Sequence, residues 1–137
     1  MNKLWLLPLA STLSLSAQAA NLTITMTDLP QPKGQLMVAV YDSAEAMKSG
    51  QQALARQTIA VHSNRHSMTL NDLPAGQYAV MVFQDLNANN RLDRNFIGIP
   101  SEPYGFSNNP SVMGAPDFED IAFPLGEDDL QIRIRVE

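Results

Sequence analysis

Apolar and polar side chains alternate in two segments, one near the start of the chain and one at its end. Residues 22–27 read LTITMT and residues 130–136 read LQIRIRV, so that every second side chain is apolar. Because successive side chains of a β-strand point to opposite faces, this alternation predicts two strands that each bury one face. No segment carries the apolar repeat of a long amphipathic helix, so an all-β fold is expected.

Four more segments have the composition of strands, because they are rich in apolar and β-favouring residues and are bounded by turn-forming residues. They are residues 34–41, 58–61, 67–70 and 76–84. The polar residues 62–66 between the second and third of these segments predict a β-hairpin. Residues 42–50 are predicted to form a short helix or turn, with Asp42 and Glu45 as a capping box and Gly50 at its C-terminal end.

About seven short strands at this spacing predict an antiparallel β-sandwich of the immunoglobulin or transthyretin kind. A small β-barrel is the alternative. Residues 20–137 are expected to form this single domain, which is long enough to bury roughly 65% of the surface of the unfolded chain. The chain contains no cysteine, so packing, with or without a bound ion, must stabilise the fold.

The first 19 residues have the pattern of a secretory signal peptide. Lys3 precedes an apolar stretch over residues 4–15, and the small residues Ala17 and Ala19 flank Gln18. This order predicts cleavage after Ala19 and export to the periplasm or the medium. The apolar stretch is shorter than the roughly 20 residues that span a bilayer, so membrane insertion is not expected.

The charge balance limits the choice of partners. The sequence has 9 Lys and Arg residues against 14 Asp and Glu residues, a net charge of −5, and loss of Lys3 with the signal peptide would make it −6. Nucleic acid and anionic lipid are therefore not expected as partners. An envelope protein, a peptide or a glycan is expected instead.

The pattern of strands breaks between residues 85 and 117, where prolines and glycines leave little room for paired strands. A loop of this length inside a compact domain is usually either functional or disordered. Apolar residues in or next to it favour an ordered loop and are expected to anchor it. They are Phe96, Ile97, Ile99, Tyr104, Phe106 and Phe118. The side chains expected to contact a partner are those of Tyr104, Phe106 and Asn108.

Oxygen-bearing side chains recur at positions 1, 3, 5 and 9 of the first part of this loop, a spacing typical of calcium-binding loops. They belong to Asp85, Asn87, Asn89 and Asp93. Arg91, at position 7, would add its backbone carbonyl, and Leu92 would anchor the loop to the core. Asn90 stands at position 6, where the chain turns sharply and glycine is usual, and asparagine tolerates the left-handed conformation that this position requires.

The closing carboxylate must come from elsewhere in the chain, because position 12 is Phe96 instead of the bidentate glutamate of an EF-hand. Glu102 is the expected ligand, with Asp117 and Asp120 as alternatives. The loop is therefore predicted to bind calcium. The alternatives are magnesium and an ion-free turn in which the same side chains cap backbone amides.

Catalytic motifs are incomplete. Ser107 lies in the string GFSNN, which lacks the last glycine of a nucleophile elbow, and Ser107 is expected to be a turn residue. Glu102 with Asp117, Glu119 or Asp120 could form a carboxylate pair of the glycosidase type. The chain is expected not to be an enzyme, with a small hydrolase that uses the acidic residues near Glu102 as the alternative.

Residues 72–109 resemble a bacterial family, domain of unknown function 2141. The resemblance rests on DLPAGQYAVMVFQDLNANNRLD followed by FIGIPSEPYGFSNN, in which the GIP-x-EPYGFSNN string is the distinctive part. It extends over about residues 34–123, and it departs from the family at Asn90, where glycine is usual. The resemblance implies an exported β-sandwich similar to transthyretin or to carboxypeptidase regulatory domains, and it implies no particular activity.

These patterns together predict an exported, non-catalytic binding or accessory module with a calcium-stabilised loop. A calcium-stabilised structural subunit of an envelope assembly is a further alternative.

Overall fold

The computed structural model describes residues 19–111 and 114–137, together with Pro8. Apart from Pro8 and Ala19, the predicted signal peptide lies outside the described residues. In chain order the elements are β1 (Ala19–Thr27), β2 (Gln35–Tyr41), α1 (Ala44–Ser49), β3 (Ala55–Ala60), β4 (His66–Pro74), β5 (Gly76–Asp85), β6 (Tyr104–Phe106), α2 (Phe118–Ile121), β7 (Phe123–Leu125) and β8 (Leu130–Arg135). Neither helix is long and apolar enough to cross a membrane, as far as the described residues go.

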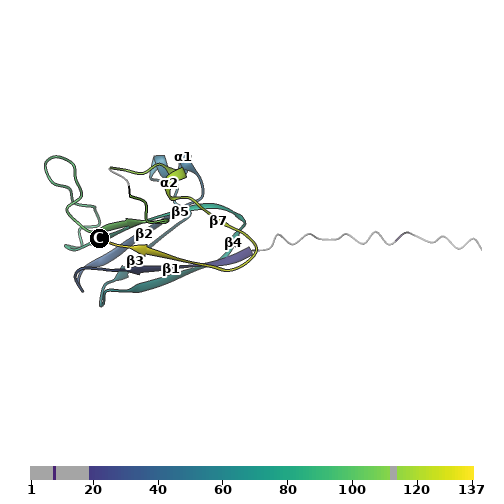
Figure 1. Ribbon diagram of the computed structural model, residues 1–137, viewed down its shortest axis with the longest axis horizontal. Coiled ribbons are helices and arrows are strands. Elements are labelled where there is room, and N and C mark those ends of the chain that lie inside the picture. The colour runs from purple at the N-terminus through teal and green to yellow at the C-terminus, as the bar shows by residue number, and fades with distance from the viewer. Residues whose placement is uncertain (1–7, 9–18, 112–113) are drawn as a thin grey trace, which may run out of the picture.

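The strands form two sheets that pack face to face. The smaller sheet has the order β4-β1-β8, and the larger has the order β3-β2-β5-β6, with β7 also paired to β5. In Figure 1 the layer that contains β1 lies below the layer that contains β2 and β5. Neighbouring strands are antiparallel except β1 and β8, which run parallel. The predicted all-β sandwich is therefore confirmed, with eight strands in the described residues instead of about seven, and with one parallel pair.

The core lies between the two sheets and follows the alternation of the sequence. On β1, Leu22, Ile24 and Met26 are fully buried, while the intervening threonines face outward. Val80 on β5 and Ile134 on β8 are also fully buried in the same apolar cluster. Burial of such side chains stabilises the fold by roughly 1.5–3 kcal/mol each, so packing can hold this sandwich together without a disulfide.

The predicted hairpin around residues 62–66 is wrong. β3 pairs with β2 in the larger sheet, whereas β4 pairs with β1 in the smaller one. The segment therefore carries the chain from one sheet to the other. A polar turn between two strands fits either arrangement, so the local pattern does not distinguish them.

The predicted short helix is confirmed as α1, but its N-terminal cap differs from the expectation. The side chain of Ser43, instead of that of Asp42, accepts a hydrogen bond from the backbone N–H of Ala46 at 3.1 Å. Gly50 ends the helix in the left-handed conformation, with φ of 66°. Serine at this position satisfies one of the free N–H groups of the first turn.

Residues 85–117 contain more regular structure than expected. The three-residue strand β6 pairs with residues 81–83 of β5, which corrects the prediction that this segment lacks paired strands. In Figure 1 the loop that follows β5 projects on the same side of the molecule as α1 and α2, beyond the larger sheet. The larger sheet therefore carries the loop and both helices on its outer side.

Candidate functional site

Asp85 ends β5 and folds the following loop back onto it. Its side chain is fully buried. One carboxylate oxygen accepts a hydrogen bond from the backbone N–H of Asn89 at 3.2 Å, and the other accepts from the N–H of Asn90 at 2.8 Å and from Gln35 Nε2 at 2.9 Å. Asn90 has φ of 63°, which confirms that this position needs a left-handed conformation.

Glu102 joins the two ends of the same loop. The residue is 6% exposed, and its carboxylate accepts hydrogen bonds from the backbone N–H of Leu86 at 2.7 Å and of Asp93 at 2.8 Å. The structure therefore brings Glu102 to the loop that holds Asp85. The alternatives Asp117 and Asp120 lie at the N-terminal end of α2, where Asp120 Oδ2 accepts a hydrogen bond from the backbone N–H of Asp117 at 2.9 Å.

Asp93 is held by the two asparagines of the predicted series. Its carboxylate oxygens accept hydrogen bonds from Asn87 Nδ2 at 2.7 Å and from Asn89 Nδ2 at 2.9 Å. The hydrogen bond from Asn89 is the largest cause that lowers the pKa of Asp93, helped by Asn87 and the positive charge of Arg91 and opposed by partial desolvation. Asp93 therefore favours its ionised form.

The loop over residues 85–93, together with Glu102, brings together carboxylate and amide oxygens, which calcium prefers as ligands. In the structure, the hydrogen bonds of these side chains are those of a turn whose backbone N–H groups are capped. An ionised carboxylate has about four lone-pair sites, so Asp85 and Glu102 keep acceptor capacity beside their backbone bonds. Rotation of the Asn87 and Asn89 side-chain amides by half a turn would direct their oxygens toward Asp93. Among the described residues no group of three or more His, Cys, Asp or Glu side chains is arranged to hold a metal.

The outer face of the larger sheet is apolar and forms a groove of about 620 Å³. Pairing of the strands places Met37 opposite Phe83 and Phe83 opposite Tyr104, with Ala39, Met81 and Phe106 in the adjacent row. Residues 90–100 and 114–116 contribute the walls. The volume lies in the range of small-ligand sites, about 300–1,000 Å³. Sequence reasoning missed the groove, although its signal was present in strands that are apolar on both faces.

The predicted partner contacts divide between two roles. Tyr104 and Phe106 line the groove, with their ring centroids 5.6 Å apart. Asn108 instead donates a hydrogen bond from Nδ2 to the backbone oxygen of Ala122 at 2.8 Å. Leu92 also lines the groove, so the prediction that it anchors the loop to the core between the sheets is wrong.

Three predicted anchors of the loop are exposed instead. Phe96 is 100% exposed, Ile97 65% and Ile99 54%. Backbone hydrogen bonds hold this tip, since Asn95 N–H donates to the oxygen of Ile99 at 2.8 Å and Gly98 N–H donates to the oxygen of Asn95 at 3.0 Å. Polar contacts, not apolar burial, therefore order the tip.

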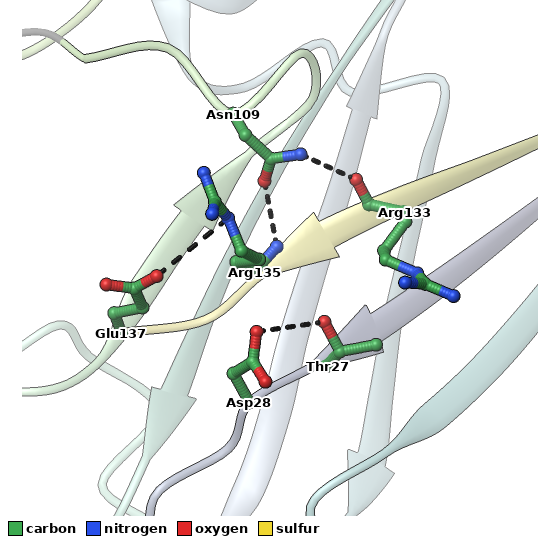
Figure 2. Close-up of polar contacts among 6 residues, drawn as sticks. All are labelled: Thr27, Asp28, Asn109, Arg133, Arg135 and Glu137. Carbon is green, nitrogen blue, oxygen red and sulfur yellow. Dashed lines mark hydrogen bonds and ion pairs between the residues drawn. The ribbon is translucent and has the colours of Figure 1, made fainter.

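The GFSNN string connects separate parts of the fold. The hydroxyl of Ser107, fully buried, accepts a hydrogen bond from Val80 N–H at 3.0 Å and donates one to the oxygen of Ile121 at 2.5 Å. Asn109, with φ of 43°, contacts β8 as a neighbouring strand would. Its Nδ2 donates to the oxygen of Arg133 at 2.9 Å and its Oδ1 accepts from Arg135 N–H at 2.8 Å, as Figure 2 shows. The string thus has a structural role.

Two packed sheets, with a hydrogen-bonded loop beside an apolar groove, define an all-β sandwich of the kind that displays loops on a rigid scaffold. The chain belongs to the family described as "Uncharacterized protein conserved in bacteria (DUF2141)", whose model matches residues 24–133. The resemblance noted in the sequence is therefore confirmed. No curated protein and no solved structure matches the chain.

Proposed function

We propose that the chain is an exported, non-catalytic binding module, in which calcium stiffens the loop over residues 85–93 and the groove beside it receives a ligand or partner. One observation carries this proposal. Asn90 and Leu92, which line the groove, lie between Asp85 and Asp93, the two carboxylates of the loop. An ion held by the loop would therefore also hold one wall of the groove in place.

The proposed ion is calcium because the loop offers several oxygens at alternate positions, and magnesium favours a smaller octahedral shell with retained water. Outside the cytoplasm a dissociation constant on the order of 10⁻⁴ to 10⁻³ M suffices. With free calcium at about ten times that constant, binding stabilises the folded state by roughly 1.4 kcal/mol.

The hydrogen bonds of Ser107 and Glu102, the two side chains considered for catalysis, support a non-catalytic role. Ser107 is fully buried with its hydroxyl bonded to backbone groups, and both oxygens of Glu102 accept backbone N–H groups. Each side chain thus already has a structural role in the fold. Loss of turnover in Glu102→Gln, on a glycan or ester substrate and with the fold intact, would favour the hydrolase alternative instead.

Thermal unfolding of the protein, purified after expression of the full chain, tests the ion. Calcium is expected to raise the melting temperature by roughly 5 °C over the value with chelator, and magnesium by much less. Asp93→Asn keeps the side-chain shape and should remove most of the rise. Asp128→Asn, an exposed position outside the loop, is the matched control and should keep it. Equal shifts with both cations, or none, would contradict the calcium site.

Retention of a partner tests the binding module. The immobilised protein is expected to retain a component of an envelope extract, a peptide or a glycan in the presence of calcium. Met37→Glu places a charge in the groove and should abolish retention, whereas Gln131→Glu places the same charge on β8 and should not. Loss in both variants, or in neither, would count against the groove. Concentration-dependent self-association without retention would favour a structural subunit.

A further inference from the structure

We infer that the groove binds a single-chain amphipathic anion, of the fatty-acid class, with the apolar chain along the outer face of β2, β5 and β6 and the carboxylate at an arginine of the groove lining, Arg56 or Arg94. This inference deepens the proposed binding function and rests on it. It names what the groove would take, which neither the family nor the predicted loop specifies.

The lining of the groove is positively charged, although the protein is acidic. The chain as a whole has a net charge of −5, yet the charged residues that line the groove are Arg56 and Arg94, with no acidic residue among the lining residues. Within residues 19–111 and 114–137, the ion pair that forms joins Arg135 to Glu137 and involves neither of them. The groove therefore has the charge that complements an anion in an otherwise acidic protein.

Both arginine side chains keep hydrogen-bond donors available for an anion. Arg56 donates to the backbone oxygen of Gly50, and Arg94 donates to that of Gly98 at 3.1 Å. A guanidinium carries five N–H donors in a planar fork, so most of them remain available to a carboxylate. These backbone bonds are made by the guanidinium groups themselves, so they hold both head groups in place and reduce the entropy lost when an anion binds.

The floor of the groove is apolar. Met37, Met81, Phe83 and Phe106 are only half-buried, and together they present a continuous apolar surface. Methionine side chains adapt to flexible apolar ligands, which suits an alkyl chain. A glycan would instead place hydroxyl groups against this floor without hydrogen-bond partners, at a cost in free energy. The floor thus favours a hydrocarbon over a sugar.

A second copy of the chain fits the groove less well. The tip of the loop exposes the apolar side chains of Phe96 and Ile97, which a second copy could insert into the groove, but Arg94 adjoins the tip in the sequence. Insertion would carry that arginine to a groove whose lining already includes two arginines, and two acidic copies would also repel each other. A free single-chain anion avoids both costs.

Calorimetric titration with dodecanoate, below its micelle concentration, tests the inference on the purified protein. One dodecanoate per chain is expected to bind, and dodecan-1-ol and dodecylammonium are expected to bind at least roughly tenfold more weakly because they lack the anion. The double variant Arg56→Gln, Arg94→Gln should weaken dodecanoate binding about tenfold while leaving the affinity for dodecan-1-ol unchanged. Arg133→Gln, which removes the same charge on β8, should change neither.

Several outcomes would overturn the inference. They are no dodecanoate binding to the wild-type protein, equal affinity for dodecanoate and dodecan-1-ol, full affinity in a correctly folded double variant, or binding to phosphatidylglycerol vesicles without dodecanoate binding. If dodecanoate fails to bind while Met37→Glu still abolishes partner retention, the ligand class is wrong and the binding module stands. If Met37→Glu has no effect on retention or on dodecanoate, the groove itself is wrong.

Discussion

At the scale of single residues, the long loop is organised by polar side chains that bond to the backbone. Asp85 and Glu102 together accept four backbone N–H groups, those of Leu86, Asn89, Asn90 and Asp93. A buried carboxylate is tolerated when it is hydrogen-bonded in this way. The same geometry is compatible with an ion-free turn and with an ion-binding loop. The turn and the loop differ only in what contacts the remaining lone pairs of the Asp85 and Glu102 carboxylates.

The pKa of Asp93 is a residue-scale test of this network. Asn89→Ala removes the largest cause of its lowering, so the pKa of Asp93 should rise toward the ordinary value of about 3.9. Because the folded-state pKa is lowered, ionised Asp93 contributes stability above about pH 4, and this stability is lost as the pH falls through the lowered pKa. The variant should therefore lose less stability than the wild type over that acidic range.

Carboxyl titration by NMR spectroscopy measures this shift directly. Asn64→Ala, in the exposed turn between β3 and β4, is the control and should leave the titration of Asp93 unchanged. An unaltered pKa in Asn89→Ala would mean that Asn89 does not hold Asp93 in solution.

At the scale of elements, substitution of the N-terminal cap of α1 tests directly whether Ser43 stabilises this helix. Ser43→Ala removes the side-chain acceptor for Ala46 N–H and should lower the free energy of unfolding by about 1 kcal/mol. Asp42→Ala, the neighbouring position first expected to cap α1, should change it by less than about 0.5 kcal/mol. Urea denaturation of both variants decides between them, and the reverse order of effects would restore Asp42 as the cap.

The elements that the sequence predicts well are the long alternating ones. β1 and β8 show one apolar residue in two, and the structure turns those residues toward the core as expected. The alternating apolar residues of β1 and Ile134 of β8 are buried, and Leu130 and Ile132 pack partly buried against the core. β6 and β7 have three residues each, too few for a periodic pattern, so they escape prediction. The sequence also does not predict where the chain crosses from one sheet to the other. The side-chain pattern of β3 and β4 indicates which face of each strand is buried, but not which strand lies beside it.

The candidate site likewise has one part that the local sequence predicts and one part that depends on how the strands pair. The oxygen series from Asp85 to Asp93 is local, so its spacing can be recognised in the sequence. The groove joins Met37, Phe83 and Tyr104 from three strands, and only the register of the larger sheet places them side by side. The approach of Glu102 to this loop could also be predicted from the sequence, because Pro100 and Pro103 on either side restrict the backbone around it.

At the scale of the whole molecule, Gly105 allows β6 of the larger sheet to lie close against the end of β8 in the smaller sheet. A Cβ at this position would lie 2.2 Å from the backbone oxygen of Arg135 and 2.7 Å from Ile134 Cγ2, both at the end of β8. Tyr104 and Glu137 exchange two backbone hydrogen bonds of 3.1 Å beside it. Only a residue without a side chain allows this approach.

Gly105→Ala should therefore lower the free energy of unfolding by about 2 kcal/mol or more, because backbone atoms must separate. Gly126→Ala is the matched control, since a Cβ there meets no atom within 4 Å, and its effect should stay within about 0.5 kcal/mol. Chemical denaturation of both proteins measures the difference. Equal stability of the two variants would show that β6 and β8 do not pack this closely.

The parallel pairing of β1 with β8 has a mechanical consequence. The two strands are the first and the last in the described part of the chain, and they share six residue pairs, from Leu22 with Leu130 to Thr27 with Arg135. Since they run in the same direction, the start of β1 and the end of β8 lie at opposite ends of the sandwich. A tension applied between those ends acts on the whole ladder in shear, so the load is shared by all of its hydrogen bonds at once.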